Sequence, residues 1–213
     1  MSLRAVIFDY GEVISRAANK AVHRQLVETA GLDQETFDKW YWALRLDYDA
    51  GILNRLTYFQ KLAEFAGTEF STAQIERLGE LDARMWMDIN EPMLAWVSQI
   101  QRAGLRIAIL SNMGDGVLSA MLREFPWLGQ FDALVWSHEL GIVKPDPAIY
   151  RYTVDALAVQ PQEALFIDNL QENVAGAEAI GLHAIHFENI DQLGREIARR
   201  GFNLPLPDAV AAG

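Results

Sequence analysis

Short apolar runs that end in polar residues recur along the chain, and longer segments with helical spacing separate them. The first run, residues 5–8, is partly β-branched and is followed at once by Asp9, which is typical of a buried strand. Later runs of the same kind, the last of them weaker, lie at residues 105–110, 164–167, 183–187 and 133–136. Strands that alternate with helices predict βαβ units, a parallel sheet and helices on both of its faces.

Helix start signals support this alternation. Asn90 with Pro92 starts one predicted helix, and Asp146 with Pro147 starts another. The alternation makes the predicted fold a three-layer, Rossmann-like α/β core.

The segment 15–89 breaks the pattern, since it has several helical periodicities and no convincing strand. Ser71 with Gln74 is a capping-box signal for one of its helices. We therefore predict a helical bundle of about 75 residues inserted into a discontinuous core made of residues 1–14 and 90–213. Most of its large aromatic residues should form the bundle's own core, and a minority should line a pocket facing the sheet. They are Trp40, Tyr41, Trp42, Tyr48, Tyr58, Phe59 and Trp86.

The composition of the chain argues against several classes of protein. An apolar fraction of 51 % excludes a disordered chain, and the absence of cysteine excludes disulfides and thiolate metal sites. The net charge of −11, with no basic run, argues against nucleic-acid binding. The longest uncharged stretch, Pro92 to Gln101, is far shorter than the about 20 residues of a membrane span. We expect a cytoplasmic protein, and a homodimer is left open.

Polar side chains follow the predicted strands where each one ends. In an open parallel sheet, ligands bind beyond the carboxyl ends of the strands, so these side chains should meet at one edge. They are Asp9, Ser111, Asn112, Asp168 and Asn169, with Lys144 in the loop before a helix. Two carboxylates with no cation between them repel each other, and all-oxygen ligation favours Mg²⁺. Together with a hydroxyl and an ammonium group, they form a set suited to phosphoryl transfer.

The order of these motifs resembles that of the haloacid-dehalogenase-like hydrolase superfamily. The matching pieces are VIFDYGEVI at 6–14, AILSN at 108–112, KPDPAIY at 144–150 and LFIDNLQENVAGAEAIG at 165–181. The resemblance implies a five-stranded sheet of order 5-4-1-2-3, with the segment 15–89 as the family's helical cap. It also implies Asp9 as nucleophile, Ser111 and Lys144 as phosphoryl-binding residues, and Mg²⁺ held by Asp9, the Gly11 carbonyl and Asp168.

The chain departs from the usual phosphatase pattern at two positions. Gly11 stands where most phosphatases of the superfamily carry a second aspartate as general acid, although DYGEV is similar to the D-x-G-N-V loop of a subgroup. Glu12 could replace that acid, but a salt bridge is the role we favour for it. Asn169 stands where many relatives have an aspartate, and it would orient a metal-bound water. Asn173 fits a helix cap as well as a site residue.

These observations predict a Mg²⁺-dependent phosphomonoester hydrolase that acts on a small phosphorylated metabolite, such as a sugar phosphate, through an aspartyl-phosphate. We expect the substrate to contact Gly11, Glu12, Asn112 and Asn169. One alternative is a metal-independent 2-haloacid dehalogenase, which needs no general acid, but Asp168 would repel its anionic substrate. The other is a non-catalytic protein that binds a phosphorylated ligand, since Gly11 and Asn169 both weaken the usual catalytic set.

Overall fold

The computed structural model describes residues 3–208 and contains a five-stranded parallel sheet of order β3-β2-β1-β4-β5. The order predicted from the resemblance is the same order read from the other edge, so it is confirmed. The strands are β1 (Ala5–Phe8), β2 (Arg106–Ser111), β3 (Ala133–Trp136), β4 (Ala164–Asp168) and β5 (His183–His186).

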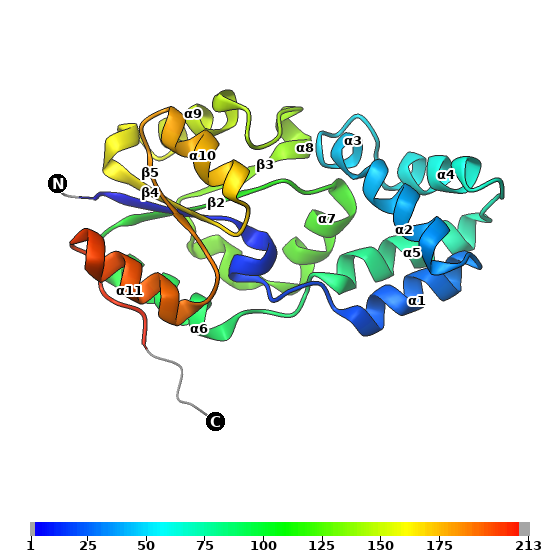
Figure 1. Cartoon of the computed structure of the whole chain (residues 1–213), viewed down its shortest axis with the longest axis horizontal. Helices are drawn as coiled ribbons and strands as arrows, with labels where there is room; N and C mark the ends of the chain where they lie inside the picture. The colour runs from blue at the N-terminus through cyan, green and yellow to red at the C-terminus, as the bar shows by residue number, and fades with distance from the viewer. Residues whose placement is uncertain (1–2, 209–213) are drawn as a thin grey trace.

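Helices cover both faces of the sheet, which gives the three layers seen in Figure 1. Side chains alternate along β1, so that Val6 and Phe8 pack on one face while Ala5 and Ile7 pack on the other. The first face is covered by α6 (Glu91–Arg102), α7 (Asp115–Glu124) and α11 (Ile190–Arg200). The second face is covered by α9 (Pro147–Ala156) and α10 (Gln171–Ala179).

The remaining core elements are short. They are the wide turn η1 (Tyr10–Ile14), the 3₁₀ turns η2 (Pro126–Gln130) and η3 (Pro161–Glu163), and the single-turn helix α8 (Ser137–Leu140). The predicted start of α9 is confirmed, because the Asp146 side chain accepts a hydrogen bond from the Ala148 amide at 2.8 Å. Of these elements, η1 and α8 follow the carboxyl ends of β1 and β3, whereas η2 and η3 precede β3 and β4.

The segment between β1 and α6 contains five helices, which lie to one side of the sheet in Figure 1. They are α1 (Lys20–Ala30), α2 (Gln34–Ala43), α3 (Arg45–Asp49), α4 (Arg55–Phe65) and α5 (Thr72–Met85). The capping box of Ser71 and Gln74 starts α5, as predicted. Most of the aromatic residues form a core of their own, in which the rings of Tyr48 and Tyr58 stack 4.5 Å apart. We call this bundle the cap; its boundaries at residues 15 and 89 stay a prediction.

The two chain segments that join the cap to the core run side by side. Ser15 and Ile89 form an antiparallel bridge, and the Asn90 amide donates to the Ile14 carbonyl at 2.9 Å. The Tyr10 hydroxyl also donates to the Trp86 carbonyl at 2.8 Å. The chain therefore leaves and re-enters the core at one place.

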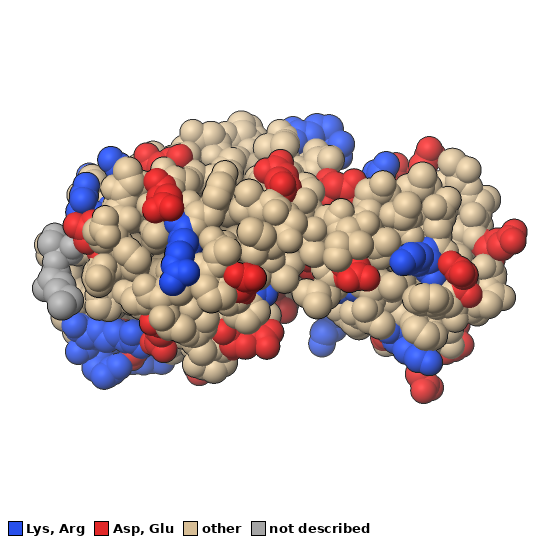
Figure 2. Space-filling model, turned by 90° about the horizontal axis from the view of Figure 1, so that it is seen from above, with Lys and Arg blue, Asp and Glu red and all other residues tan. Residues whose placement is uncertain are grey.

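A second contact docks the cap on the loop after β2. The Gly116 amide donates to the Tyr48 hydroxyl at 3.1 Å, and a Cβ at Gly114 would lie 2.3 Å from the Tyr48 ring. The Ser137 hydroxyl reaches the Asp49 carbonyl at 2.5 Å from α8. Figure 2 shows the result as two lobes joined at a narrower waist, with acidic and basic side chains interspersed on the visible face. None of the helices within residues 3–208 is long and apolar enough to cross a membrane.

Candidate active site

The ammonium group of Lys144 lies between two carboxylates at the carboxyl edge of the sheet. Its Nζ donates to Asp9 Oδ1 at 2.8 Å and to Asp168 Oδ2 at 2.6 Å, and all three side chains are buried. The sheet register brings the carboxylates together, since Phe8 pairs with Ile167 and the next residues along the two strands are Asp9 and Asp168. When all three groups are ionised, the trio has one negative charge in excess.

Asn112 holds the backbone of Lys144 in place from the neighbouring loop. The Lys144 amide donates to Asn112 Oδ1 at 2.8 Å, and Asn112 Nδ2 donates to the Lys144 carbonyl at 3.0 Å. This pair of hydrogen bonds ties the loop after β2 to the loop before α9. Asn112, predicted to contact the substrate, thus fixes the lysine that separates the carboxylates.

The carboxylate of Asp168 is fully hydrogen-bonded. Asn173 Nδ2 donates to both of its oxygens at 3.1 Å, and the Leu170 amide donates to Oδ1 at 2.8 Å. With Lys144 on Oδ2, these contacts engage the about four lone-pair positions that a carboxylate offers. The Tyr150 hydroxyl in turn donates to the Asn173 carbonyl at 2.8 Å. Of the two roles open for Asn173 in the sequence, the structure shows the one at the site.

Burial dominates the electrostatics of the site. It raises the pKa of Asp9 to about 7, because the contact with Lys144 only partly offsets the loss of water and Asp168 adds repulsion. Burial also disfavours the ammonium form of Lys144, but the two carboxylates outweigh it and raise its pKa. Lys144 is therefore charged at neutral pH, while Asp9 titrates there.

The loop after Asp9 leaves open space where a general acid would stand. A Cβ built on Gly11 would lie 3.9 Å from both Asp9 Oδ2 and the Trp86 ring, which is ordinary contact. Glu12 is exposed and has a φ of 59°, and its amide donates to the Ser15 hydroxyl at 3.2 Å. No salt bridge to Glu12 is present within residues 3–208, so the favoured role of this residue is not seen there.

A cavity of about 290 Å³ opens over this trio, between core and cap. The predicted site residues that line it are Asp9, Gly11, Glu12, Ser111, Asn112, Lys144 and Asn169. Asp168 lies outside the cavity wall, and its side chain is fully buried. Within residues 3–208, the Ser111 hydroxyl makes one long contact, a donation of 3.5 Å to the Asn112 carbonyl, which a closer ligand acceptor could replace.

The cap contributes four residues to the same cavity: Trp42, Arg45, Asp49 and Trp86. The two tryptophans belong to the aromatic set from which a pocket-lining minority was expected. Arg45 and Asp49 were not predicted, because no sequence spacing connects them to the strand ends. Their local signal is the four-residue separation on one short helix, which matches many surface ion pairs equally well.

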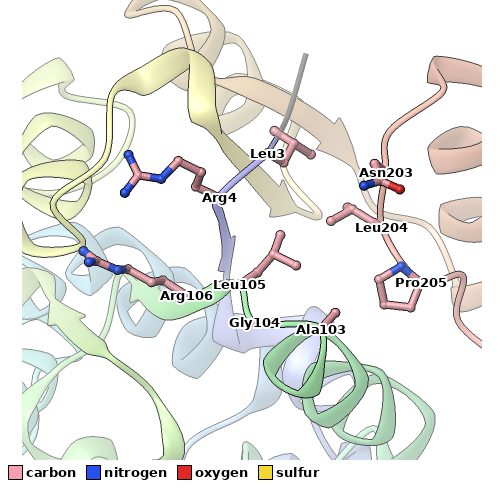
Figure 3. A pocket seen from close by; sticks show the side chains of 9 residues that line it. All are labelled: Leu3, Arg4, Ala103, Gly104, Leu105, Arg106, Asn203, Leu204 and Pro205. Carbon is pink, nitrogen blue, oxygen red and sulfur yellow. The ribbon is translucent and has the colours of Figure 1, made fainter.

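Another cavity, of about 600 Å³, lies near the starts of β1 and β2 (Figure 3). Its lining includes Arg4 and Arg106 but no acidic side chain, and Arg4 is already paired with Glu163. The carboxylate chemistry therefore belongs to the cavity under the cap. Within residues 3–208, no three acidic, histidine or cysteine side chains converge to hold a metal ion.

A sequence profile of the haloacid dehalogenase-like hydrolases matches residues 3–181. The chain belongs to this family. It is 26 % identical over 198 residues to (S)-2-haloacid dehalogenase 1 of a Pseudomonas strain, covering 89 % of this chain and 86 % of that protein. It is 24 % identical over 188 residues to a phosphatase of Mycobacterium tuberculosis, covering 86 % and 87 %.

The fold matches solved structures of the same family. A HAD family enzyme of Bacteroides thetaiotaomicron, solved with magnesium and inorganic phosphate, superposes with a TM-score of 0.72 and 19 % identity, over 90 % of this chain and 99 % of that one. The haloacid dehalogenase-like hydrolases similar to this chain thus include both dehalogenases and phosphatases. The protein is a hydrolase of this family, and the choice between the two reactions depends on the site.

Proposed function

We propose that the protein is a Mg²⁺-dependent phosphomonoester hydrolase that acts on a small phosphorylated metabolite. The observation that carries this proposal is the second buried carboxylate, Asp168, held 2.6 Å from the ammonium group that also contacts Asp9. When both buried carboxylates are ionised, one ammonium leaves an uncompensated negative charge, which favours a further cation at the site. A phosphatase needs such a cation, whereas a metal-independent enzyme would bind its anionic substrate against that charge.

The oxygen donors fit a hard divalent ion in part. Within residues 3–208, no side-chain donor reaches Asp9 Oδ2, and the neighbouring Gly11 carbonyl adds a neutral oxygen, as Mg²⁺ prefers. Asp168 would join them if Lys144 exchanged its contact with Oδ2 for a phosphoryl oxygen. Bound there, Mg²⁺ would supply charge for the phosphoryl oxygens.

Asp9, Lys144 and Ser111 each have a separate role in the proposed reaction. An oxygen of Asp9 forms a bond to phosphorus as the bond between phosphorus and the leaving oxygen breaks. The leaving oxygen takes a proton from water, because Gly11 offers none. Lys144 and the Ser111 hydroxyl donate to the phosphoryl oxygens during transfer. Water then attacks phosphorus, which releases inorganic phosphate and restores the Asp9 carboxylate.

A metal-independent 2-haloacid dehalogenase is the second candidate. Two observations favour it: the lone pairs of Asp168 are all engaged, and the reaction needs no general acid at Gly11. The curated dehalogenase relative also spans most of the chain. In this reaction Asp9 would displace halide from carbon, and Lys144 would keep the two carboxylates apart.

Two product assays separate the candidates. We expect the protein to release phosphate from acetyl phosphate and p-nitrophenyl phosphate with Mg²⁺, and to lose this activity in EDTA or on Asp9→Asn. Chloride release from 2-chloropropionate in EDTA would instead establish the dehalogenase. If neither product forms while inorganic phosphate still binds in calorimetry, the protein is a non-catalytic binder and the proposal is wrong.

A further inference from the structure

We infer that Arg45 and Asp49 of the cap select substrates with neutral hydroxyl groups near the phosphate and disfavour substrates with a second anionic group. This inference rests on the proposed phosphatase function, which supplies the phosphate end of the substrate. It concerns the other end, because both residues line the same cavity of about 290 Å³ as Asp9 and Lys144. The volume is at the lower limit of ligand pockets, so a substrate held at the trio would also reach the cap.

Arg45 lines the cavity, and its contacts within residues 3–208 leave one guanidinium nitrogen unengaged. Its Nε donates to Asp49 Oδ1 at 3.0 Å, and its Nη1 donates to the Tyr41 hydroxyl at 3.0 Å and to Asp82 Oδ1 at 3.1 Å. In the part of the chain that the structure describes, Nη2 makes no hydrogen bond. The side chain is 14 % exposed, so its two Nη2 hydrogens are left for a ligand.

Asp49 lines the same cavity, and its contacts within residues 3–208 leave one carboxylate oxygen unengaged. Arg45 engages only Oδ1, and no donor from residues 3–208 contacts Oδ2. The side chain is 12 % exposed, and the backbone of this residue is tied to the core by Ser137. A donor and an acceptor on neighbouring, rigidly held groups match two adjacent hydroxyls, each of which can both donate and accept.

The charge of this cluster argues against a second anion on the substrate. Arg45 is paired with two carboxylates, Asp49 and Asp82, and the Tyr41 hydroxyl also donates to Asp82. The cluster therefore has one negative charge in excess and would repel a substrate carboxylate. Burial opposes the charged form of Arg45, yet Asp49, Tyr41 and Asp82 raise its pKa, so Arg45 is charged at neutral pH. Burial also raises the pKa of Asp49, and the contact with Arg45 opposes that rise.

The apolar walls of the cavity fit the carbon chain of such a substrate. Trp42, half exposed on α2, and Trp86 at the end of α5 lie in the cavity wall with Met113 and Val117 from the core. Indole rings pack well against the C–H groups of a hydroxylated chain. The favoured substrate class is a small polyol or sugar monophosphate.

A matched pair of substrates tests this inference on the unmodified protein. Glycerol 3-phosphate and 3-phosphoglycerate differ only where a hydroxymethyl group is replaced by a carboxylate. We expect kcat/KM for glycerol 3-phosphate to exceed that for 3-phosphoglycerate by about tenfold or more. Equal values, or a preference for the carboxylate, overturn the inference even if the phosphatase function stands.

Asp49→Asn then assigns the preference to this cluster. The amide removes the excess charge with little change in volume, so kcat/KM for glycerol 3-phosphate should fall while that for 3-phosphoglycerate should rise. A merely structural role would lower both values together, which would contradict the inference. Asp47→Asn is the control, because it makes the same change on the same helix outside the cavity and should leave the ratio unchanged.

The two proposals fail in different ways. If no phosphate is released from acetyl phosphate by the unmodified protein, the phosphatase proposal is wrong. If acetyl phosphate is hydrolysed but the glycerol 3-phosphate preference is absent, only the assignment of Arg45 and Asp49 is wrong. Circular dichroism would check that Asp49→Asn is folded. The wild-type substrate pair tests the preference without any variant.

Discussion

Asn173 donates to both oxygens of Asp168 at 3.1 Å, from five residues further along the chain. This contact fixes the plane of the carboxylate and directs one oxygen at Lys144. The side-chain amide of Asn173 therefore holds Asp168. An aspartate at position 173 would have nearly the same shape but would add a third carboxylate to the site. The charge of the site is therefore sensitive to a change at position 173.

Asn173→Asp should make the protein depend on a divalent cation for stability. A third carboxylate beside one ammonium removes two hydrogen bonds and adds repulsion, so the free energy of unfolding in EDTA should fall by about 1–3 kcal/mol. Saturating Mg²⁺ should restore most of the loss, as measured by urea unfolding. Asn203→Asp, at an exposed position, is the control and should change stability by less than about 0.5 kcal/mol. Equal loss with and without Mg²⁺ would contradict this prediction.

Lys144→Met should destabilise the fold strongly. The substitution keeps most of the side-chain volume but leaves two buried carboxylates without a cationic partner, a loss of about 3–5 kcal/mol for a broken buried pair. Lys61→Met, at an exposed position in α4, provides the matched comparison and should be close to neutral. If thermal or urea unfolding shows the two variants equally stable, Lys144 does not hold the carboxylates together in the way described.

The strand ends were predictable because short apolar runs stop at polar residues, and parallel strands bring those residues to one edge. Asp9, Ser111 and Asp168 follow from that rule alone. Asn173 was ambiguous, because an asparagine near a helix start serves equally well as a cap. Arg45 and Asp49 could not be predicted, since their place over the trio depends on how α3 docks on the loop after β2. That docking rests on tertiary contacts, such as the Tyr48 ring over Gly114, which leave no periodic signal in the sequence.

Gly11→Asp should speed the hydrolysis of phosphate esters with poor leaving groups. The backbone has ordinary φ and ψ values there, and a Cβ meets only contacts of 3.9 Å, so the aspartate fits without displacing the chain. A general acid contributes about 10²–10⁴-fold at best, and we expect about tenfold or more for alkyl phosphates. Acetyl phosphate, whose leaving group needs no proton, should change little. Gly11→Asn, which cannot donate a proton as an acid, should not reproduce the gain.

Stability should fall as the pH rises through the titration of Asp9. Its pKa is about 7 in the fold and 3.8 in the unfolded reference, so the folded state binds more protons between these values. The contribution of Asp9 to stability is therefore fully present below pH 3.8 and is lost as the pH rises through about 7. Urea unfolding in EDTA at pH 5 and pH 8 should show a smaller loss for Asp9→Asn than for the wild type. An equal loss of stability between pH 5 and pH 8 in the two proteins would show that Asp9 does not titrate in this range.

The paired crossings at Ser15 and Ile89 have a consequence for how this protein could diversify. Because the two ends of the cap are paired with each other where they join the core, the distance between them is fixed at that point. We expect the junction to accept bundles of other lengths and sequences with little movement of the strands, provided that they replace the contact of Tyr48 with the loop after β2. An insertion joined in this way can therefore be exchanged during evolution or by design while the carboxylates at the edge of the sheet keep their places.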